Sequence, residues 1–362
     1  MITSVIESRP ITGCFDGLLK RRHGTRVNPV PTRFRTRLGA MALVLLAAVF
    51  GWPEGECRVA AAERPAWVHS GLANASVAVA VGTNRFLTGC DEENVVKLYR
   101  SGVSGPALAE YDLTKWLDLH GHPGDADIEG AARIGDVIYW LGSHSRARDG
   151  RPRPNRERIL ATRIHEETNG VVTLERVGKP CVNLLSALLR APQLSRFHLL
   201  EAMGKAPEED GGLNLEGLAA TADGGLLIGF RSPLVNGKSL VVPLRNPAEI
   251  MNGAKPELGE PLLLDLDGLG VRDMVFTGIE YFILGGRTAH GGTSHLFRWA
   301  GGTAVPEKVD KAGLRHLNPE GVANVGTRER PRLLVVSDDG NQPFNRNRPP
   351  GLRTFRSVWV DP

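Results

Sequence analysis

The chain repeats a short motif in which an acidic residue is followed by glycine. The three clear copies are Asp127-Ile128-Glu129-Gly130, Asn214-Leu215-Glu216-Gly217 and Asn318-Pro319-Glu320-Gly321, and Val271-Arg272-Asp273 is a degenerate fourth. Each copy is followed by a turn, an apolar run and a small polar cluster, which is the order expected of a β-hairpin. The apolar runs are Val137–Leu141, Leu226–Ile228, Tyr281–Leu284 and Leu333–Val336. The repeat therefore constrains the chain to a fold built from similar hairpins.

The spacing of these hairpins indicates the fold class. An additional hairpin is predicted at Val77–Thr88, so units begin near residues 77, 128, 215, 272 and 319. Each unit contains about four short apolar runs, and most units span about 50 residues, as in the blades of a β-propeller. We therefore predict an all-β protein, a β-propeller of five or six four-stranded blades. A β-sandwich is the alternative.

The longest gap between units holds a different pattern. Leu184, Leu185 and Leu188 recur at helical spacing, which predicts a short helical insertion over about 182–204. Whether a sixth blade is hidden within 178–212 stays open. The last unit lacks an outer strand, and Ala66–Val68 could supply it and close the ring.

The N-terminal 62 residues differ from the rest in charge. Nine of the 44 basic and four of the 40 acidic residues lie there, so the remainder is close to neutral. A nearly neutral body argues against nucleic acid as a partner. Arg33, Arg35 and Arg37 precede an uncharged run, 38–52, and small residues follow at Ala60–Ala62. This order predicts a leader and signal peptide over 1–62 and a single propeller domain over 63–362.

The predicted signal places the protein outside the cytoplasm, in the periplasm or secreted. The uncharged run is short for a membrane span, so no stable span is expected after cleavage. An uncleaved signal anchor in the membrane is the alternative. The oligomeric state is left open.

The polar clusters and the acidic motifs should meet in space. In a hairpin the start of the first strand lies beside the end of the second, and the first strand of a propeller blade lines the central axis. We therefore expect Glu129 near His144, Glu216 near Arg231, and Glu320 near Asp339. All of them would face one mouth of the axial channel.

These residue types suggest a metal-dependent site. Oxygen ligands suit Ca²⁺ or Mg²⁺, arginine can hold an anionic group, and histidine is an acid or base at neutral pH. The predicted metal ligands are Asp127, Glu129, Glu216, Asp273, Glu320 and Asp339. The predicted catalytic residues are His144, Arg231, Arg272 and Glu129, and the predicted ligand-binding residues are Arg146, Arg287 and Asn214. Alternatively, each acidic residue bonds to amides of the neighbouring blade.

The motifs also resemble those of a bacterial family called domain of unknown function 3616, over about residues 70–360. The resemblance rests on Asp127-Ile128-Glu129-Gly130, Ile138-Tyr139-Trp140, Gly142-Ser143-His144-Ser145-Arg146, Pro154-Asn155-Arg156, Asn214-Leu215-Glu216-Gly217-Leu218, Gly229-Phe230-Arg231, Val271-Arg272-Asp273, Pro319-Glu320-Gly321 and Ser337-Asp338-Asp339-Gly340. It implies no established activity.

Two functions are compatible with this pattern. The first is a divalent-metal-dependent hydrolase that acts on a phosphoester or lactone at the channel mouth, with a small anionic ligand or substrate. The second is a propeller without chemistry that binds a ligand or protein and contains structural calcium. Whether the protein is an enzyme is left open by the residues.

Overall fold

The structure is a computed structural model that describes residues 5–6, 65–119, 124–289, 292–309 and 312–362. The predicted leader and signal peptide lies outside these ranges, except for strand β1 (Val5–Ile6), which pairs with β11 (Val172–Cys181). No helix in the described ranges is long and apolar enough to cross a membrane.

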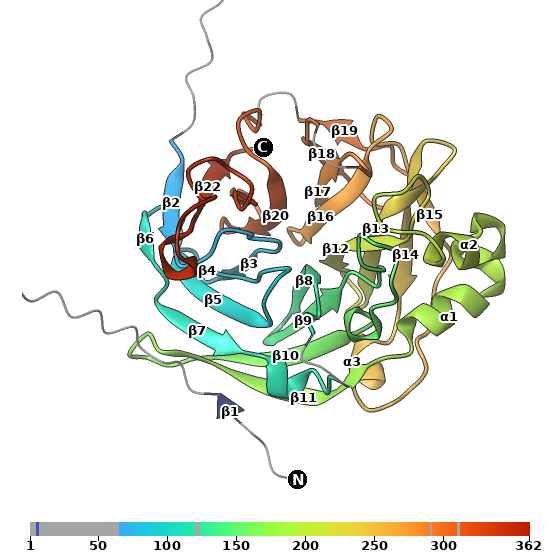
Figure 1. The fold of residues 1–362 in the computed structure, drawn as a ribbon, viewed down its shortest axis with the longest axis horizontal. Coiled ribbons are helices and arrows are strands. Elements are labelled where there is room, and N and C mark those ends of the chain that lie inside the picture. The colour runs from blue at the N-terminus through green and yellow to red at the C-terminus, as the bar shows by residue number, and fades with distance from the viewer. Residues whose placement is uncertain (1–4, 7–64, 120–123, 290–291, 310–311) are drawn as a thin grey trace, which may run out of the picture. The chain divides into compact units, whose positions relative to one another are not determined.

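The described residues from 65 onward form five β-sheets arranged around a central axis (Figure 1). Blade one consists of β3 (Val79–Val81), β4 (Arg85–Thr88), β5 (Val95–Arg100) and β7 (Ala109–Asp112). Blade two consists of β8 (Ile128–Ile134), β9 (Val137–Gly142), β10 (Ile159–Glu166) and β11. Blade three consists of β12 (Asn214–Ala220), β13 (Leu226–Val235), β14 (Lys238–Leu244) and β15 (Leu262–Leu264). Blade four consists of β16 (Gly270–Phe276), β17 (Tyr281–Gly286), β18 (His295–Trp299) and β19 (Glu307–Lys308).

Blade five closes the ring with a strand from the start of the domain. It consists of β20 (Pro319–Asn324), β21 (Leu333–Ser337), β22 (Thr354–Val360) and β2 (Trp67–Ser70), with β6 (Gly105–Pro106) parallel to β2. The pairing of Trp67 with Ser357 and of Ser70 with Thr354 sets the register of β2. The predicted outer strand at 66–68 is thus confirmed, and so is the five-bladed propeller; the β-sandwich is wrong.

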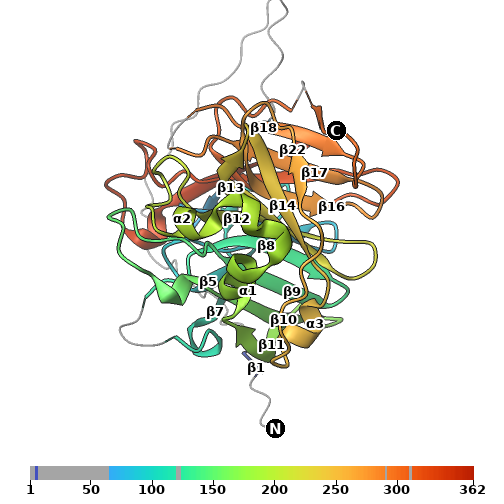
Figure 2. The same cartoon turned by 90° about the vertical axis from the view of Figure 1, so that its right-hand side faces the viewer.

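The insertion after blade two is helical and adds no sixth blade within the described residues. It contains α1 (Leu184–Arg190), η3 (Pro192–Phe197) and α2 (Leu199–Met203), which lie on the outside of blade three (Figures 1 and 2). Leu184, Leu185 and Leu188 are buried against side chains that include Leu215 and Phe230. The helical spacing therefore reflects one apolar face packed on the sheets. The other short helices are η1 (Thr114–Trp116), η2 (Pro154–Arg156), α3 (Pro247–Ile250) and η4 (Pro350–Leu352).

The inner strands share a β-bulge at the same height. The pairing shifts by one residue at Glu129 in β8, at Glu216 in β12, at Arg272 in β16 and at Glu320 in β20. In blade one the pairs Ala75–Cys90 and Val79–Leu87 place the same shift before β3, and Ser76 occupies the bulged position. A bulge changes the direction in which a side chain points. The repeated motif thus marks the bulge.

The glycine that follows each glutamate is required by close packing between blades. A Cβ atom on Gly130 would lie 2.7 Å from the carbonyl oxygen of Glu216, and one on Gly321 would lie 2.6 Å from the backbone of Val77. Both distances are shorter than any non-bonded contact of this kind, so a larger residue would push the inner strands apart. These glycines therefore allow the inner strands of neighbouring blades to pack closely around the axis.

Candidate functional site

The bulged residues of all five blades line one cavity at a mouth of the central channel. The cavity has a volume of about 950 Å³. The bulged residues are Ser76, Glu129, Glu216, Arg272 and Glu320. The residues two positions before four of them line it as well, namely Asn74, Asp127, Asn214 and Asn318. The repeated motif therefore supplies two rings of polar side chains to one site.

The ends of the second strands contribute a further set of side chains. Asp91 follows β4, Arg231 lies in β13, and Asp338 follows β21, and all three line the cavity. This is the meeting of strand starts and strand ends that hairpin geometry predicts. Among the described residues, ten acidic and five basic side chains line the cavity, so its wall carries an excess of negative charge.

Three carboxylates gather at one side of this mouth. One oxygen from each of Asp91, Asp127 and Glu129 lies within 4.8 Å of the others, close enough to bind a single metal ion. Burial, followed by the charges of Asp127 and Asp338, raises the pKa of Asp91 to about 7. Burial and then the charge of Glu216 raise the pKa of Glu129 well above its usual range. Neither carboxylate has an ion-pair partner in the described part of the chain. A divalent cation would relieve the crowding of like charges.

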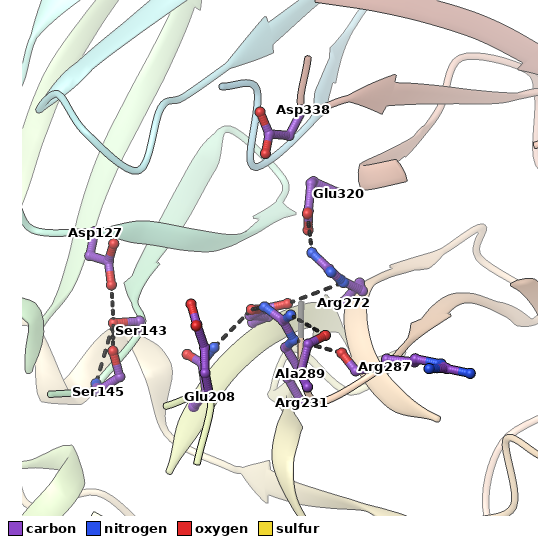
Figure 3. Close-up of polar contacts among 12 residues, drawn as sticks. Asp127, Ser143, Ser145, Glu208, Arg231, Arg272, Arg287, Ala289, Glu320 and Asp338 are labelled. Atoms are coloured by element: carbon purple, nitrogen blue, oxygen red, sulfur yellow. Dashed lines mark hydrogen bonds and ion pairs between the residues drawn. The ribbon is translucent and has the colours of Figure 1, made fainter. Parts of the chain in front are cut away.

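Asp127 is held more firmly than the other two. The hydroxyl of Ser143 donates to its Oδ2 atom (Figure 3). A guanidinium nitrogen of Arg156 lies 2.7 Å from the same oxygen. Burial nevertheless outweighs these partners and raises the pKa of Asp127 to about 6. The backbone at Asp127 has a φ of 52°, a left-handed conformation that aspartate tolerates better than most residues.

The opposite side of the mouth is neutralised by arginine. A guanidinium nitrogen of Arg231 lies 2.6 Å from Oε1 of Glu216, and Arg272 forms an ion pair with Glu320 (Figure 3). Burial lowers the pKa of Arg272, but the charges of Glu320 and Glu216 outweigh this effect and raise it. Burial raises the pKa of Glu320 to about 7, although Arg272 acts in the other direction. Glu320 therefore changes its charge near neutral pH.

Asp273 does not reach the cavity, contrary to its prediction as a metal ligand. The bulge of β16 lies at Arg272, so Asp273 occupies the position of the glycine in the other motifs. Its carboxylate is fully buried and accepts hydrogen bonds from the amides of Met274 and Val322, each at 2.8 Å. Asp273 thus connects blade four to blade five, which is the structural alternative stated for the acidic motifs.

Three further predicted residues come one position too late to line the cavity. The cavity-lining position at the end of the second strand is the one that Arg231 and Asp338 occupy, and these three residues directly follow it or its equivalent in their own blades. Asp339 is fully buried and accepts two hydrogen bonds from Arg356, at 2.8 Å and 2.7 Å. His144 is buried and hydrogen bonded to the carbonyl of Gly142, and burial lowers its pKa to about 4. The side chain of Arg287 extends away from the cluster (Figure 3). None of the three is among the residues that line the cavity.

Arg146 connects the loop after β9 to the helical insertion. Its Nε atom donates to the carbonyl of Met203 at 2.7 Å, and a second guanidinium nitrogen donates to the carbonyl of Gly150 at 2.9 Å. Its side chain therefore connects its own loop to the end of α2 and does not line the cavity. Asn214, in contrast, lines the cavity and donates to Oε1 of Glu216 at 2.8 Å.

A protein-family comparison matches most of this propeller. The family described as "Protein of unknown function (DUF3616)" matches residues 74–178 and 157–348. The chain belongs to the DUF3616 family. Both cavity-lining rings of this DUF3616 protein fall within the matched residues. No curated protein matches the sequence.

Solved structures resemble this DUF3616 protein only distantly. The major Malassezia sympodialis allergen Mala s 1 is 10% identical with a TM-score of 0.44, and the match covers 81% of this chain and 94% of the allergen. An α-L-arabinofuranosidase from Podospora anserina is 8% identical with a TM-score of 0.46, covering 83% and 98%. An exo-β-1,3-galactanase from Phanerochaete chrysosporium is 11% identical with a TM-score of 0.41, covering 80% and 60%.

Asp91 is the member of the acidic cluster that the sequence did not reveal. Blade one carries Ser76 where the other motifs carry glutamate or arginine, so its repeat is hard to recognise. The signal that could have found Asp91 is its place after Gly89 and Cys90, at the end of the second strand. Asp338 occupies the same place in blade five.

Proposed function

We propose that the protein is a divalent-metal-dependent hydrolase whose site is the acidic mouth of the channel. The observation that carries the proposal is the cluster of Asp91, Asp127 and Glu129, in which three carboxylate oxygens lie within 4.8 Å of one another. All three would supply oxygen ligands, which suits Ca²⁺ or Mg²⁺ better than the softer transition metals.

The chain supplies an acid–base group on the other side of the same mouth. A divalent ion supplies Lewis acidity toward an ester carbonyl. Glu320 has a pKa of about 7, which suits a general base that takes a proton from water at neutral pH. Arg272 forms an ion pair with Glu320 and fixes the orientation of its carboxylate. His144 is not assigned a role, because it is buried outside the cavity.

The charge of the cavity favours a lactone over a phosphoester. Ten acidic side chains face five arginines, and Arg231 and Arg272 already form ion pairs with Glu216 and Glu320. A phosphate group would bring further negative charge to this wall, and like charges repel strongly at low dielectric. An uncharged ester does not meet this repulsion.

The test uses purified protein with and without a chelator. We expect Ca²⁺ or Mg²⁺ to raise the melting temperature and to support turnover of a panel of lactones, with little turnover of phosphoesters. Glu129→Gln should lose the response to metal, and Glu320→Gln should keep it but lose turnover. Asp136→Asn, in the turn after β8, is the control. A protein that neither binds metal nor shows turnover would sink the proposal.

The alternative is a binding propeller with structural calcium. It is favoured by the burial of Arg231 and Arg272 in ion pairs, which leaves little of their charge for a substrate. Under this alternative calcium raises the melting temperature, Glu129→Gln lowers stability, and no lactone or phosphoester is turned over. The same experiment therefore separates the two functions.

We also propose that the protein is exported. The support is the order of Arg33, Arg35 and Arg37, the uncharged run 38–52 and the small residues Ala60–Ala62. N-terminal sequencing of the protein recovered from its native compartment tests this, and a chain that begins near residue 63 is the expected result. An intact N-terminus in the cytoplasm would contradict it.

A further inference from the structure

Five residues that line the cavity have a buried polar atom without a hydrogen-bond partner among the described residues. Besides those of Asn74 and Arg156, they include three atoms on the neighbouring strands β12 and β16. These three are Oδ1 of Asn214, Oε2 of Glu216 and Nε of Arg272. The three residues are only 6%, 1% and 6% exposed, and all of them line the cavity. Nε of Arg272 lies 4.0 Å from Oε2 of Glu216, which is too long for a hydrogen bond.

Neighbouring atoms of the same residues already have partners, among them Nη1 of Arg272, which contacts Glu320. Oε1 of Glu216 accepts from Nδ2 of Asn214 at 2.8 Å and from Arg231 at 2.6 Å. The buried atoms of Asn214, Glu216 and Arg272 that remain unpaired are therefore two acceptors and one donor. An unpaired buried polar group is costly, so these three atoms call for a ligand or water that complements them.

The pattern of two acceptors and one donor selects the chemistry of the ligand. A hydroxyl group both donates and accepts, so one hydroxyl can donate to Glu216 while it accepts from Arg272, and a neighbouring hydroxyl can donate to Asn214. An ammonium group would leave the Arg272 donor unpaired. A carboxylate or phosphate would leave both acceptors unpaired and would face the charge of Glu216.

We propose that Asn214, Glu216 and Arg272 form a subsite for adjacent hydroxyl groups of a neutral sugar or polyol. The wider cavity agrees with this class of ligand. The amide side chains of Asn74, Asn318, Asn341 and Gln342 line it, and amides can both donate to and accept from hydroxyls. The acidic excess of the wall disfavours an anionic ligand.

This inference rests on the proposed function, because it takes the same cavity to be the substrate site. It deepens that function by naming the class of substrate. The substrate class becomes a lactone that carries adjacent hydroxyl groups, that is, a sugar lactone. The subsite lies on β12 and β16, whereas the carboxylates assigned to the metal lie on blades one and two. Binding of a sugar can therefore be measured without turnover and in the presence of a chelator.

The test measures binding of glucose, galactose, mannose and their 2-, 3- and 4-deoxy derivatives to the full protein by saturation-transfer NMR and calorimetry. We expect at least one of the three intact sugars to bind, and Asn214→Ala to weaken its binding about tenfold, the loss expected for one hydrogen bond to a buried group. Asn252→Ala is the control, because it removes the same kind of side chain at an exposed position outside the cavity. It should change the affinity less than threefold, a limit set by the scatter of such contributions.

The deoxy sugars keep the inference testable if Asn214→Ala does not fold. For the sugar that binds, we expect at least one of the three deoxy derivatives to bind about tenfold more weakly, because it lacks one of the two hydroxyls that the subsite holds. Equal binding of intact and deoxy sugars, no binding of any sugar, or equal losses in the two variants would overturn the subsite. Sugar binding without lactone turnover would instead overturn the proposed hydrolase and leave the subsite standing.

Discussion

Asp91→Asn should stabilise the metal-free protein while it removes the response to divalent cations. Asp91 lies close to Asp127 and Glu129 without an ion-pair partner in the described part of the chain. Its ordinary pKa of 3.8 is raised to about 7 by burial and then by the neighbouring acids. An asparagine keeps the size of the side chain and removes the charge that burial and the neighbours oppose.

The size of the effect follows from the pKa shift. The folded protein holds the Asp91 proton more tightly than the unfolded chain does, so the free energy of unfolding falls as the pH rises from about 4 to about 7. At pH 8 the carboxylate is charged in both states, and the shift from 3.8 to about 7 corresponds to a cost of about 4 kcal/mol. At pH 5 the Asp91 carboxyl group is protonated in the folded protein, and the cost is about 2 kcal/mol.

Urea denaturation in the presence of a chelator measures both values. We expect Asp91→Asn to raise the free energy of unfolding at pH 8 by up to about 4 kcal/mol and at pH 5 by about half as much. Added Ca²⁺ should stabilise the wild type and leave the variant unchanged. Asp136→Asn, an exposed substitution, should have little effect at either pH. A variant that is no more stable than the wild type at pH 8 would refute the reasoning.

Three further predictions concern residues in and directly behind the cavity wall. Arg272→Met should lower the free energy of unfolding by about 3–5 kcal/mol at pH 8, because it leaves the buried carboxylate of Glu320 without its counter-ion, and a change below about 1 kcal/mol in urea would contradict this. Asp273→Ala should cost about 2–4 kcal/mol by leaving the amides of Met274 and Val322 unpaired, and a thermal melt like that of the wild type would show otherwise. If Glu320 is the base, turnover should rise with pH through about 7, as its pKa implies; a flat pH–rate profile would exclude it.

The fold could be predicted from the sequence because the motif marks a feature that every blade needs. The bulge and the following glycine allow the inner strands to pack around a narrow axis, and this requirement recurs at Gly130, Gly217 and Gly321. The closing strand was also predictable, because the last unit lacked an outer strand and an apolar run preceded the first unit. The blade count was settled only by the packing of the helical insertion on blade three.

Only part of the site could be predicted, because the sequence does not show the register of the strand pairs. The order Arg272-Asp273 looks like a shifted acidic motif, but the bulge places Arg272 in the ring and Asp273 behind it. After the second strands a difference of one residue decides exposure, so Asp338 lines the cavity whereas Asp339 is buried. Asp91 was not predicted, because its blade has Ser76 at the motif position where the other blades have glutamate or arginine.

The most direct test of the acidic mouth as a metal centre is a crystal structure with Mn²⁺ or Ca²⁺ and an anomalous difference map. We predict one peak at the channel mouth, within about 2.1–2.6 Å of carboxylate oxygens of Asp91, Asp127 and Glu129. The same crystals of Asp91→Asn should lack the peak. A wild-type map without a peak at these carboxylates, at saturating metal and at pH 8, would contradict the account.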